Sequence, residues 1–198
     1  MFNKHILFSK NPLLDLVLKV ALSLAIFCVI APLKLELSTE IDAVPITFGS
    51  LLACLLPAVF GWRIGGIAAL SYVVLGILGL PIFAGYGGGL HYLIPSVEKG
   101  YSLSTGFLFG FIMAGFLVGF LAEKMTGAQI LKSLGLYFLG HLVILSMGYI
   151  HILQVKPEID LAHSIKSLLP GLLIKAAIFM TIIQMLGRKL QPGQAYER

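Results

Sequence analysis

Hydrophobic residues fill most of this chain in long runs instead of alternating with polar positions, and this pattern predicts membrane helices. A helix that crosses a bilayer needs about 20 mostly apolar residues, with about 17 at the low end. Six runs reach that length, at residues 13–32, 45–61, 64–83, 104–122, 129–151 and 168–187. We therefore expect an all-α, polytopic membrane protein with six transmembrane helices in one bundle, and residues 1–198 as a single transmembrane domain.

The composition supports a location in lipid. Only 12% of the residues are charged, whereas soluble domains have about 25%, and the mean hydropathy is +0.97. The net charge of +5 is spread along the chain, so no nucleic-acid-binding patch is expected. The first apolar run is long enough to span the membrane, and we expect it to be an anchor rather than a cleavable signal.

Lysine and arginine are divided unequally between the two sides that six spans would create. The side with both termini holds eight of them: Lys4, Lys10, Arg63, Lys124, Lys132, Arg188, Lys189 and Arg198. The other side holds four: Lys34, Lys99, Lys156 and Lys166. Cytoplasmic loops carry the basic excess, which predicts cytoplasmic termini in a bacterial plasma membrane. The longer polar connections, 33–44, 84–103 and 152–167, would then face outside.

One lysine, Lys175, stands inside the last apolar run. A charge at the centre of a membrane helix costs at least ~3 kcal/mol on insertion scales and usually marks a function. Lys175 would lie about 10 Å below the outer surface, and Pro170–Gly171 would start or bend the helix above it and open a cavity. We expect Lys175 to bind the carboxylate of a small ligand. The alternative is a lysine that snorkels to the surface without a role.

The second candidate is the glycine-rich outer connection after the third run. Glycine permits close backbone approach to a ligand or a neighbouring helix, and Gly88 lies in this segment beside Tyr86 and His91, with Tyr101 further on. A flexible outer loop and a re-entrant loop that lines a cavity are both compatible with the pattern. Thr47 lies near the outer end of the second run, where it would cap backbone groups or contact a ligand.

Other polar residues in the apolar runs favour structural roles. Cys28 and Cys54 are typical of packing, and His141 is more typical of a core histidine than of a proton relay. Asp15 and Lys19, four apart, favour an ion pair along one helix. The sequence has no metal-ligand spacing and no catalytic constellation, so we expect neither an enzyme nor a bound metal or cofactor.

The segments "GWRIGGIAALSYVVLGILGLPIFAGYGGG", "GFLFGFIMAGFLVGFLAEK" and "LLPGLLIK" together resemble the BioY family, over roughly residues 15–188. Members are biotin-binding S components of energy-coupling factor (ECF) transporters. The resemblance implies a six-helix bundle with a biotin pocket near the outer surface, a transmembrane coupling protein and two cytoplasmic ATPases as partners. Ala21 and Ala25 resemble the small-residue face by which S components dock on the coupling protein.

The chain departs from the family pattern in two places. The family usually has Pro-Gly-Asp-x-x-Lys in the last helix, where this chain has Leu172 in place of the acid and keeps Lys175. Before the fourth helix the family has Gly-Pro-Thr-Gly-Gly-Tyr, and the aligned tyrosine position is Phe107 here. Tyr101, Ser104 and His91 are the candidates for replacing the lost polar groups.

The leading prediction is therefore uptake of biotin, with Lys175 at the carboxylate. Thr47, Tyr86, Gly88, His91, Tyr101 and Phe107 are the further candidate contacts. The alternatives are an S component for another small vitamin-like carboxylate, which would explain Leu172, and a structural membrane subunit without transport activity. A membrane enzyme would need clustered acid and base groups near one membrane face.

Overall fold

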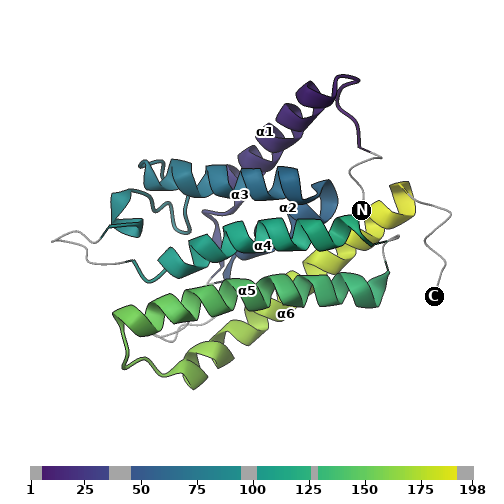
Figure 1. The fold of residues 1–198 in the computed structure, drawn as a ribbon. Coiled ribbons are helices and arrows are strands. Elements are labelled where there is room, and N and C mark those ends of the chain that lie inside the picture. The colour runs from purple at the N-terminus through teal and green to yellow at the C-terminus, as the bar shows by residue number, and fades with distance from the viewer. Residues whose placement is uncertain (1–5, 36–45, 95–101, 126–128, 191–198) are drawn as a thin grey trace.

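The computed structural model describes residues 6–35, 46–94, 102–125 and 129–190, and six α-helices dominate these residues (Figure 1). The helices are α1 (Pro12–Ile30), α2 (Gly49–Phe60), α3 (Trp62–Ile77), α4 (Thr105–Glu123), α5 (Ile130–Val155) and α6 (Leu161–Leu190). Two-residue strands, β1 (Lys34–Leu35) and β2 (Ile46–Thr47), pair antiparallel between α1 and α2. A short 3-10 turn, η2 (Leu90–Tyr92), precedes α4. The prediction of an all-α bundle of six helices is confirmed.

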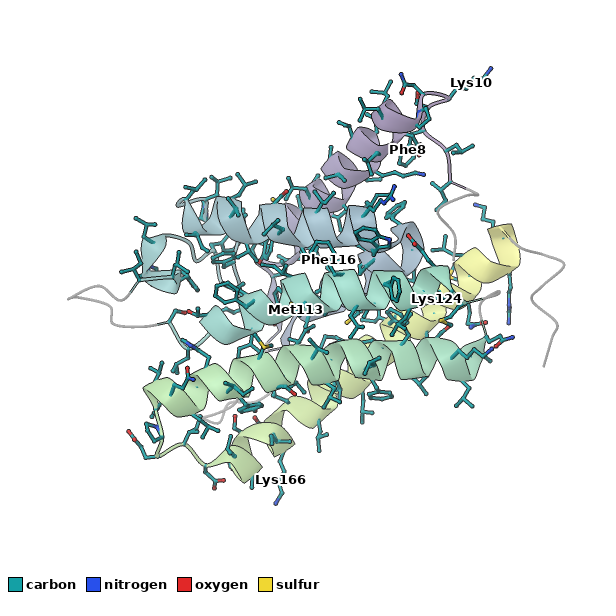
Figure 2. All side chains as sticks on the ribbon, in the orientation of Figure 1. Phe8, Lys10, Met113, Phe116, Lys124 and Lys166 are labelled. Carbon is teal, nitrogen blue, oxygen red and sulfur yellow. The ribbon has the colours of Figure 1, made fainter. Side chains whose placement is uncertain are left out.

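Four of these helices, α1, α4, α5 and α6, are long and apolar enough to cross a membrane within the described part of the chain. The protein is therefore a multi-pass membrane protein. Large apolar side chains such as Leu131 and Met113 are exposed around the outside (Figure 2), as expected for a surface that contacts lipid. Two labelled lysines in Figure 2, Lys10 and Lys166, project outward from the bundle, whereas the Lys124 ammonium lies 4.0 Å from the centroid of the Phe120 ring.

Helices α2 and α3 are shorter than the runs that predicted them. Helix α2 has 12 residues, about 18 Å of helix, because Ile46 and Thr47 pair with β1 instead of continuing the helix. Helix α3 ends at Ile77, since Gly79 adopts a φ of 112° and Leu80 N–H bonds back to Leu75 O. A residue with positive φ is a common way to end a helix.

Helix α2 forms the centre of the bundle. All twelve of its residues are buried, and α3, α4, α5 and α6 all contact it. Figure 1 shows α3, α4 and α5 side by side, with α6 crossing obliquely beside α5 and the N-terminal end of α1 leaning away from the other helices. A helix that is apolar all round and buried belongs to a core.

Close packing of α4 on α5 depends on small residues. A Cβ atom at Gly110 would lie 2.8 Å from Ile144 Cα, and one at Gly106 would meet the Met147 carbonyl oxygen and the Cα of Gly148. Glycines four apart let two helix backbones approach closely in a membrane. These contacts fix α5, and with it the side chains that α5 turns toward α2 and α6.

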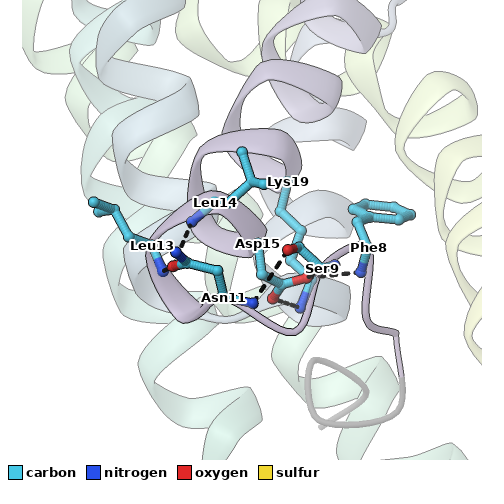
Figure 3. Close-up of polar contacts among 7 residues, drawn as sticks. All are labelled: Phe8, Ser9, Asn11, Leu13, Leu14, Asp15 and Lys19. Atoms are coloured by element: carbon cyan, nitrogen blue, oxygen red, sulfur yellow. Dashed lines mark hydrogen bonds and ion pairs between the residues drawn. The ribbon is translucent and has the colours of Figure 1, made fainter.

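The start of α1 is held by a small polar cluster (Figure 3). Asn11 caps the helix, because its side-chain oxygen accepts from the backbone N–H groups of Leu13 and Leu14. Asp15 accepts from the N–H of Phe8 at 2.8 Å and pairs with Lys19 at 2.6 Å. The predicted ion pair between Asp15 and Lys19 is confirmed.

Candidate ligand-binding site

A cavity of about 390 Å³ lies among α2, α4, α5, α6 and the segment after α3. Small-molecule sites are typically ~300–1,000 Å³ in volume, mostly apolar, with a few placed polar groups. The described wall has this character: aromatic and aliphatic side chains cover most of it, and a small number of hydroxyls, one histidine and two lysines interrupt them.

Lys175 reaches this cavity from the inward face of α6. Buried positions recur every four residues along that helix, at Gly171, Lys175, Phe179 and Ile183, while Leu173 and Ile174 are exposed on the opposite face. Only 8% of Lys175 is exposed. The side chain therefore turns into the bundle, and this geometry differs from that of a lysine that snorkels along the lipid surface.

Ser50 is the hydrogen-bond partner of Lys175. The Lys175 ammonium donates to Ser50 Oγ at 2.8 Å, and both residues line the cavity. Ser50 lies in the first turn of α2, where no side chain caps the described helix start. The N-terminus of a helix favours anions because its first N–H groups lack intrahelical acceptors. Lys175 and the start of α2 thus form one positive region suited to a carboxylate.

Helix α6 starts earlier than the last predicted span. The helix begins at Leu161 and runs through Pro170, whereas the apolar run predicted a start near residue 168 with a bend at Pro170–Gly171. Asp160 caps the helix, because its carboxylate accepts from His163 N–H at 3.0 Å. Lys175 therefore lies about 21 Å along the helix from its first residue, whereas the predicted start near residue 168 placed it about 10 Å along the span.

The exposed Asp160 carboxylate is stabilised by this cap. The hydrogen bond from the His163 N–H lowers the pKa of Asp160 below its usual value of 3.8, because the bond favours the charged form.

The first two turns of α6 add Ser164 and Ser167 to the cavity wall. These turns were expected to be a polar outer connection.

Aromatic side chains build one apolar side of the cavity. Tyr72 from α3, Phe83 and Tyr92 line it together, with ring centroids 5.4 Å apart for Tyr72 and Phe83 and 4.7 Å apart for Phe83 and Tyr92. The Tyr72 hydroxyl donates to Ile82 O at 3.1 Å. This row joins the glycine-rich segment to α3, so its described part, up to residue 94, contributes cavity wall rather than a loop separate from the bundle.

The structure brings three of the predicted contact residues to the cavity wall: Lys175, Thr47 and Phe107. It does not bring Tyr86, Gly88 or His91 there. The Tyr86 side chain is 66% exposed, and His91 packs on Tyr92 with ring centroids 4.5 Å apart. A Cβ atom at Gly88 would meet the Leu80 carbonyl oxygen, so this glycine permits packing against the end of α3. Tyr101 lies outside the described residues.

Ser104, one of the candidates for replacing the lost family groups, lines the cavity, and so does Leu172, which stands where the family has its acid. The Leu172 carbonyl accepts from the Tyr137 hydroxyl at 2.8 Å, which ties α6 to α5 one turn before Lys175. No acidic side chain lies in the described cavity wall. The described residues also contain no group of three or more His, Cys, Asp or Glu side chains placed to hold a metal ion.

Sequence reasoning missed several polar residues of the wall, in particular Ser50, Tyr149 and Lys34. Tyr149 and Ser164 hydroxyls lie 2.9 Å apart and link α5 to α6. The available signal was the isolated polar residue in an apolar run, which applies to Ser50 and His141. His141 was identified by that signal but interpreted as a core residue, and the structure places it both in the core and on the cavity wall.

The docking pair predicted from the family resemblance lies on the exposed face of α1. Ala21 and Ala25 are exposed on α1, whereas Ser23 and Phe27 face the interior. The two alanines therefore belong to the face of α1 that the other described helices leave uncovered.

A comparison of the sequence with protein families decides the relationship. The sequence profile of the BioY family matches residues 5–192 of this chain, which is nearly its whole length. The chain belongs to the BioY family. The membership predicted from the residue patterns is confirmed.

Individual BioY proteins share about a third or less of their residues with this chain over the matched segments. The biotin transporter BioY of Thermotoga maritima is 33% identical over 118 residues, covering 54% of this chain and 66% of the relative. The probable biotin transporter BioY of Rickettsia prowazekii is 28% identical over 148 residues, covering 73% of this chain and 71% of the relative. The matched segments thus span about two thirds of the length of these BioY relatives.

The fold also matches a solved structure, the S component for biotin from an ECF-type ABC transporter. The TM-score is 0.73 over 92% of this chain and 95% of that one, with 24% sequence identity. At this identity the likeness establishes the fold alone: this chain has the same helical bundle as that S component.

Proposed function

We propose that this chain is the substrate-binding subunit of a biotin transporter and captures biotin from the outer face of the membrane. The proposal is supported by BioY membership together with a cavity that holds a lysine at its wall. The prediction that the chain is a transport protein and not an enzyme is confirmed by the family, whose members named above are transporters.

The observation that carries the proposal is the position of Lys175. Among the described residues the hydrogen-bond partner of this buried ammonium is the neutral Ser50, at 2.8 Å, so its charge is incompletely compensated in a medium of low dielectric constant. A ligand carboxylate supplies the missing negative charge at that point. The aromatic and aliphatic wall suits the bicyclic ring and the four-methylene chain of biotin, which are apolar apart from the ureido group.

Thr47 and Phe107 are the other predicted contacts that the geometry favours, because both line the cavity. For Tyr86, Gly88 and His91 a direct contact with the ligand would require a rearrangement of the described loop. Contact through Tyr101 stays a prediction.

The partners and the orientation are also part of the proposal. Ala21 and Ala25 would dock on a transmembrane coupling protein that works with two cytoplasmic ATPases, and their exposure on α1 supports this. Both termini would be cytoplasmic in a bacterial plasma membrane. The described basic residues at the start of α1, the α2–α3 junction and the end of α6 favour that side as the inner one.

The second candidate, an S component for another small vitamin-like carboxylate, is favoured by one observation. Leu172 lines the cavity where the family usually carries an acid, which removes a possible partner for the polar ring of biotin. A structural subunit without a ligand is disfavoured, because it has no need for a buried lysine beside a cavity of this size.

Equilibrium binding of labelled biotin to the purified full chain in detergent tests the proposal. Competition with unlabelled biotin, and with other vitamin carboxylates such as lipoate and pantothenate, distinguishes the two candidates. Saturable binding for which biotin competes more strongly than the other carboxylates supports the proposal. Binding of lipoate or pantothenate in a direct calorimetric titration, with no binding of labelled biotin, supports the second candidate, and the absence of binding by all of them contradicts both.

A further inference from the structure

His141 lines the cavity and carries a hydrogen-bond acceptor that no described residue uses. The residue lies in the middle of α5, lines the cavity and is only 3% exposed. Its Nδ1 atom is 3.2 Å from the Tyr137 carbonyl oxygen. Because a carbonyl oxygen can only accept, Nδ1 carries the proton in this contact, and the neutral imidazole keeps a lone pair on Nε2.

That Nε2 atom is buried and has no hydrogen-bond partner within the described residues. Buried polar atoms in native proteins are almost always paired, and each exception calls for an explanation such as a ligand or a bound water. The hydroxyls of the wall differ in this respect: Ser50 accepts from Lys175, Tyr72 donates to Ile82 O, and Tyr149 pairs with Ser164.

The groups around His141 keep the imidazole in its neutral, accepting form. Cys54 on α2 lies 3.5 Å from Nδ1, the Tyr137 ring on α5 lies tilted by 37° at 4.1 Å between centroids, and Lys175 on α6 lines the same cavity. None of these carries a negative charge, and no acidic side chain lies in the described wall. A second positive charge beside Lys175 would be unfavourable.

The position of His141 relative to Lys175 follows from α2. Ser50 contacts Lys175, and Cys54, one helical turn further along α2, contacts His141. Lys175 therefore lies beside the first turn of α2, and His141 lies beside the next turn of α2, about one helical turn further along. Two residues of the cavity wall thus carry a charged donor and, separately, a neutral acceptor.

We propose that His141 Nε2 accepts a hydrogen bond from an N–H group of the ligand and so determines specificity. Ionised biotin carries N–H donors only in its ureido group, so this inference rests on the proposed function and names the contact for the ring. In this chain α6 has Leu172 where the family has an acid, and so lacks that acceptor. His141 on α5 would accept the ligand N–H instead. A carboxylate ligand without an N–H group gains nothing from His141.

The test compares biotin with lipoate, which has a similar pentanoate chain but a dithiolane ring without N–H groups. Wild type, His141→Leu and His141→Gln are titrated with both ligands. We expect His141→Leu to weaken biotin binding about tenfold or more, because the ureido N–H then stays unpaired, and to leave lipoate binding unchanged. Gln can accept through its side-chain carbonyl, and His141→Gln should recover much of the preference for biotin.

His163→Leu serves as the control, since His163 is an exposed histidine at the start of α6, and it should bind both ligands as wild type does. Retained lipoate binding shows that His141→Leu is folded. Equal losses for both ligands, or no loss for biotin, overturn the inference and leave the proposed function standing. If wild type binds lipoate and not biotin, the proposed function is wrong and the inference falls with it.

Discussion

The Lys175 ammonium donates to Ser50 Oγ at 2.8 Å, which joins the middle of α6 to the first turn of α2. The serine holds the amine beside the N-terminus of α2, where a carboxylate would receive both the ammonium and the helix N–H groups. Ser50→Ala should therefore weaken biotin binding about three- to tenfold, in line with the loss of one positioning hydrogen bond.

Titration of Ser50→Ala with labelled biotin checks this expectation. Ser146→Ala, which removes an exposed hydroxyl from α5, is the control. Binding by Ser50→Ala that equals wild type would show that the serine does not position the lysine for the ligand.

Packing of α4 against α5 gives a prediction on stability. Gly110→Ala should destabilise the protein by about 1–3 kcal/mol, because the new Cβ would lie 2.8 Å from Ile144 Cα and a backbone cannot move away cheaply. Gly135→Ala is the matched control in α5, since nothing lies within 4 Å of its Cβ position, and it should be neutral or slightly stabilising. Thermal unfolding in detergent measures both variants, and an equal Tm for the two would contradict the packing argument.

The cap of α6 gives a prediction on pH. The folded-state pKa of Asp160 lies below its usual value of 3.8 because His163 N–H bonds the carboxylate. A lowered pKa means that the carboxylate stabilises the fold above pH 3.8 and loses this contribution as the pH falls through the folded-state pKa. Asp160→Ala should lower the Tm at neutral pH, and the difference from wild type should shrink in acid.

Glu158→Ala removes an acidic side chain two residues before Asp160 and outside α6, and it should leave the Tm nearly unchanged. Thermal melts of the three proteins from pH 7 to pH 3 make the comparison. A difference between wild type and Asp160→Ala that grows in acid would contradict the assignment of the cap.

The orientation of the chain can be tested directly in membranes. In a background with Cys28 and Cys54 replaced by Ala, a cysteine at Glu158 should react with a membrane-impermeant maleimide added to intact cells, because residue 158 lies in the α5–α6 connection. A cysteine at Arg188, near the end of α6, should react only after the cells are opened. The reverse pattern would overturn the proposed cytoplasmic termini.

The number and order of the helices could be predicted from the sequence, because an apolar run of spanning length has few other stable structures in lipid. The inward face of each helix could not be predicted in the same way. Lipid and protein core are both apolar, so Phe179, which is buried, and Leu173, which is exposed, look alike in the sequence. Lys175 was identified because its charge distinguishes it in either environment.

The misplaced boundaries have local causes. The start of α6 was hidden because Asp160, His163 and Lys166 make its first turn polar, and only the cap from Asp160 marks the helix start. Ser50 and His141 acquire their importance from partners 125 and 87 residues away in the chain, respectively. Spacing along the sequence contains no information on such contacts.

The most direct test is a four-way comparison of biotin and biotinamide, whose terminal amide removes the negative charge, on wild type and Lys175→Met. Lys166→Met, which removes an exposed lysine of the same helix, is the control. Wild type should bind biotin about ten- to a hundredfold more tightly than biotinamide, since a hydrogen bond between charged groups contributes ~1.5–3 kcal/mol, and Lys175→Met should bind the two equally. If Lys175→Met keeps the full preference for biotin, Lys175 does not bind the carboxylate.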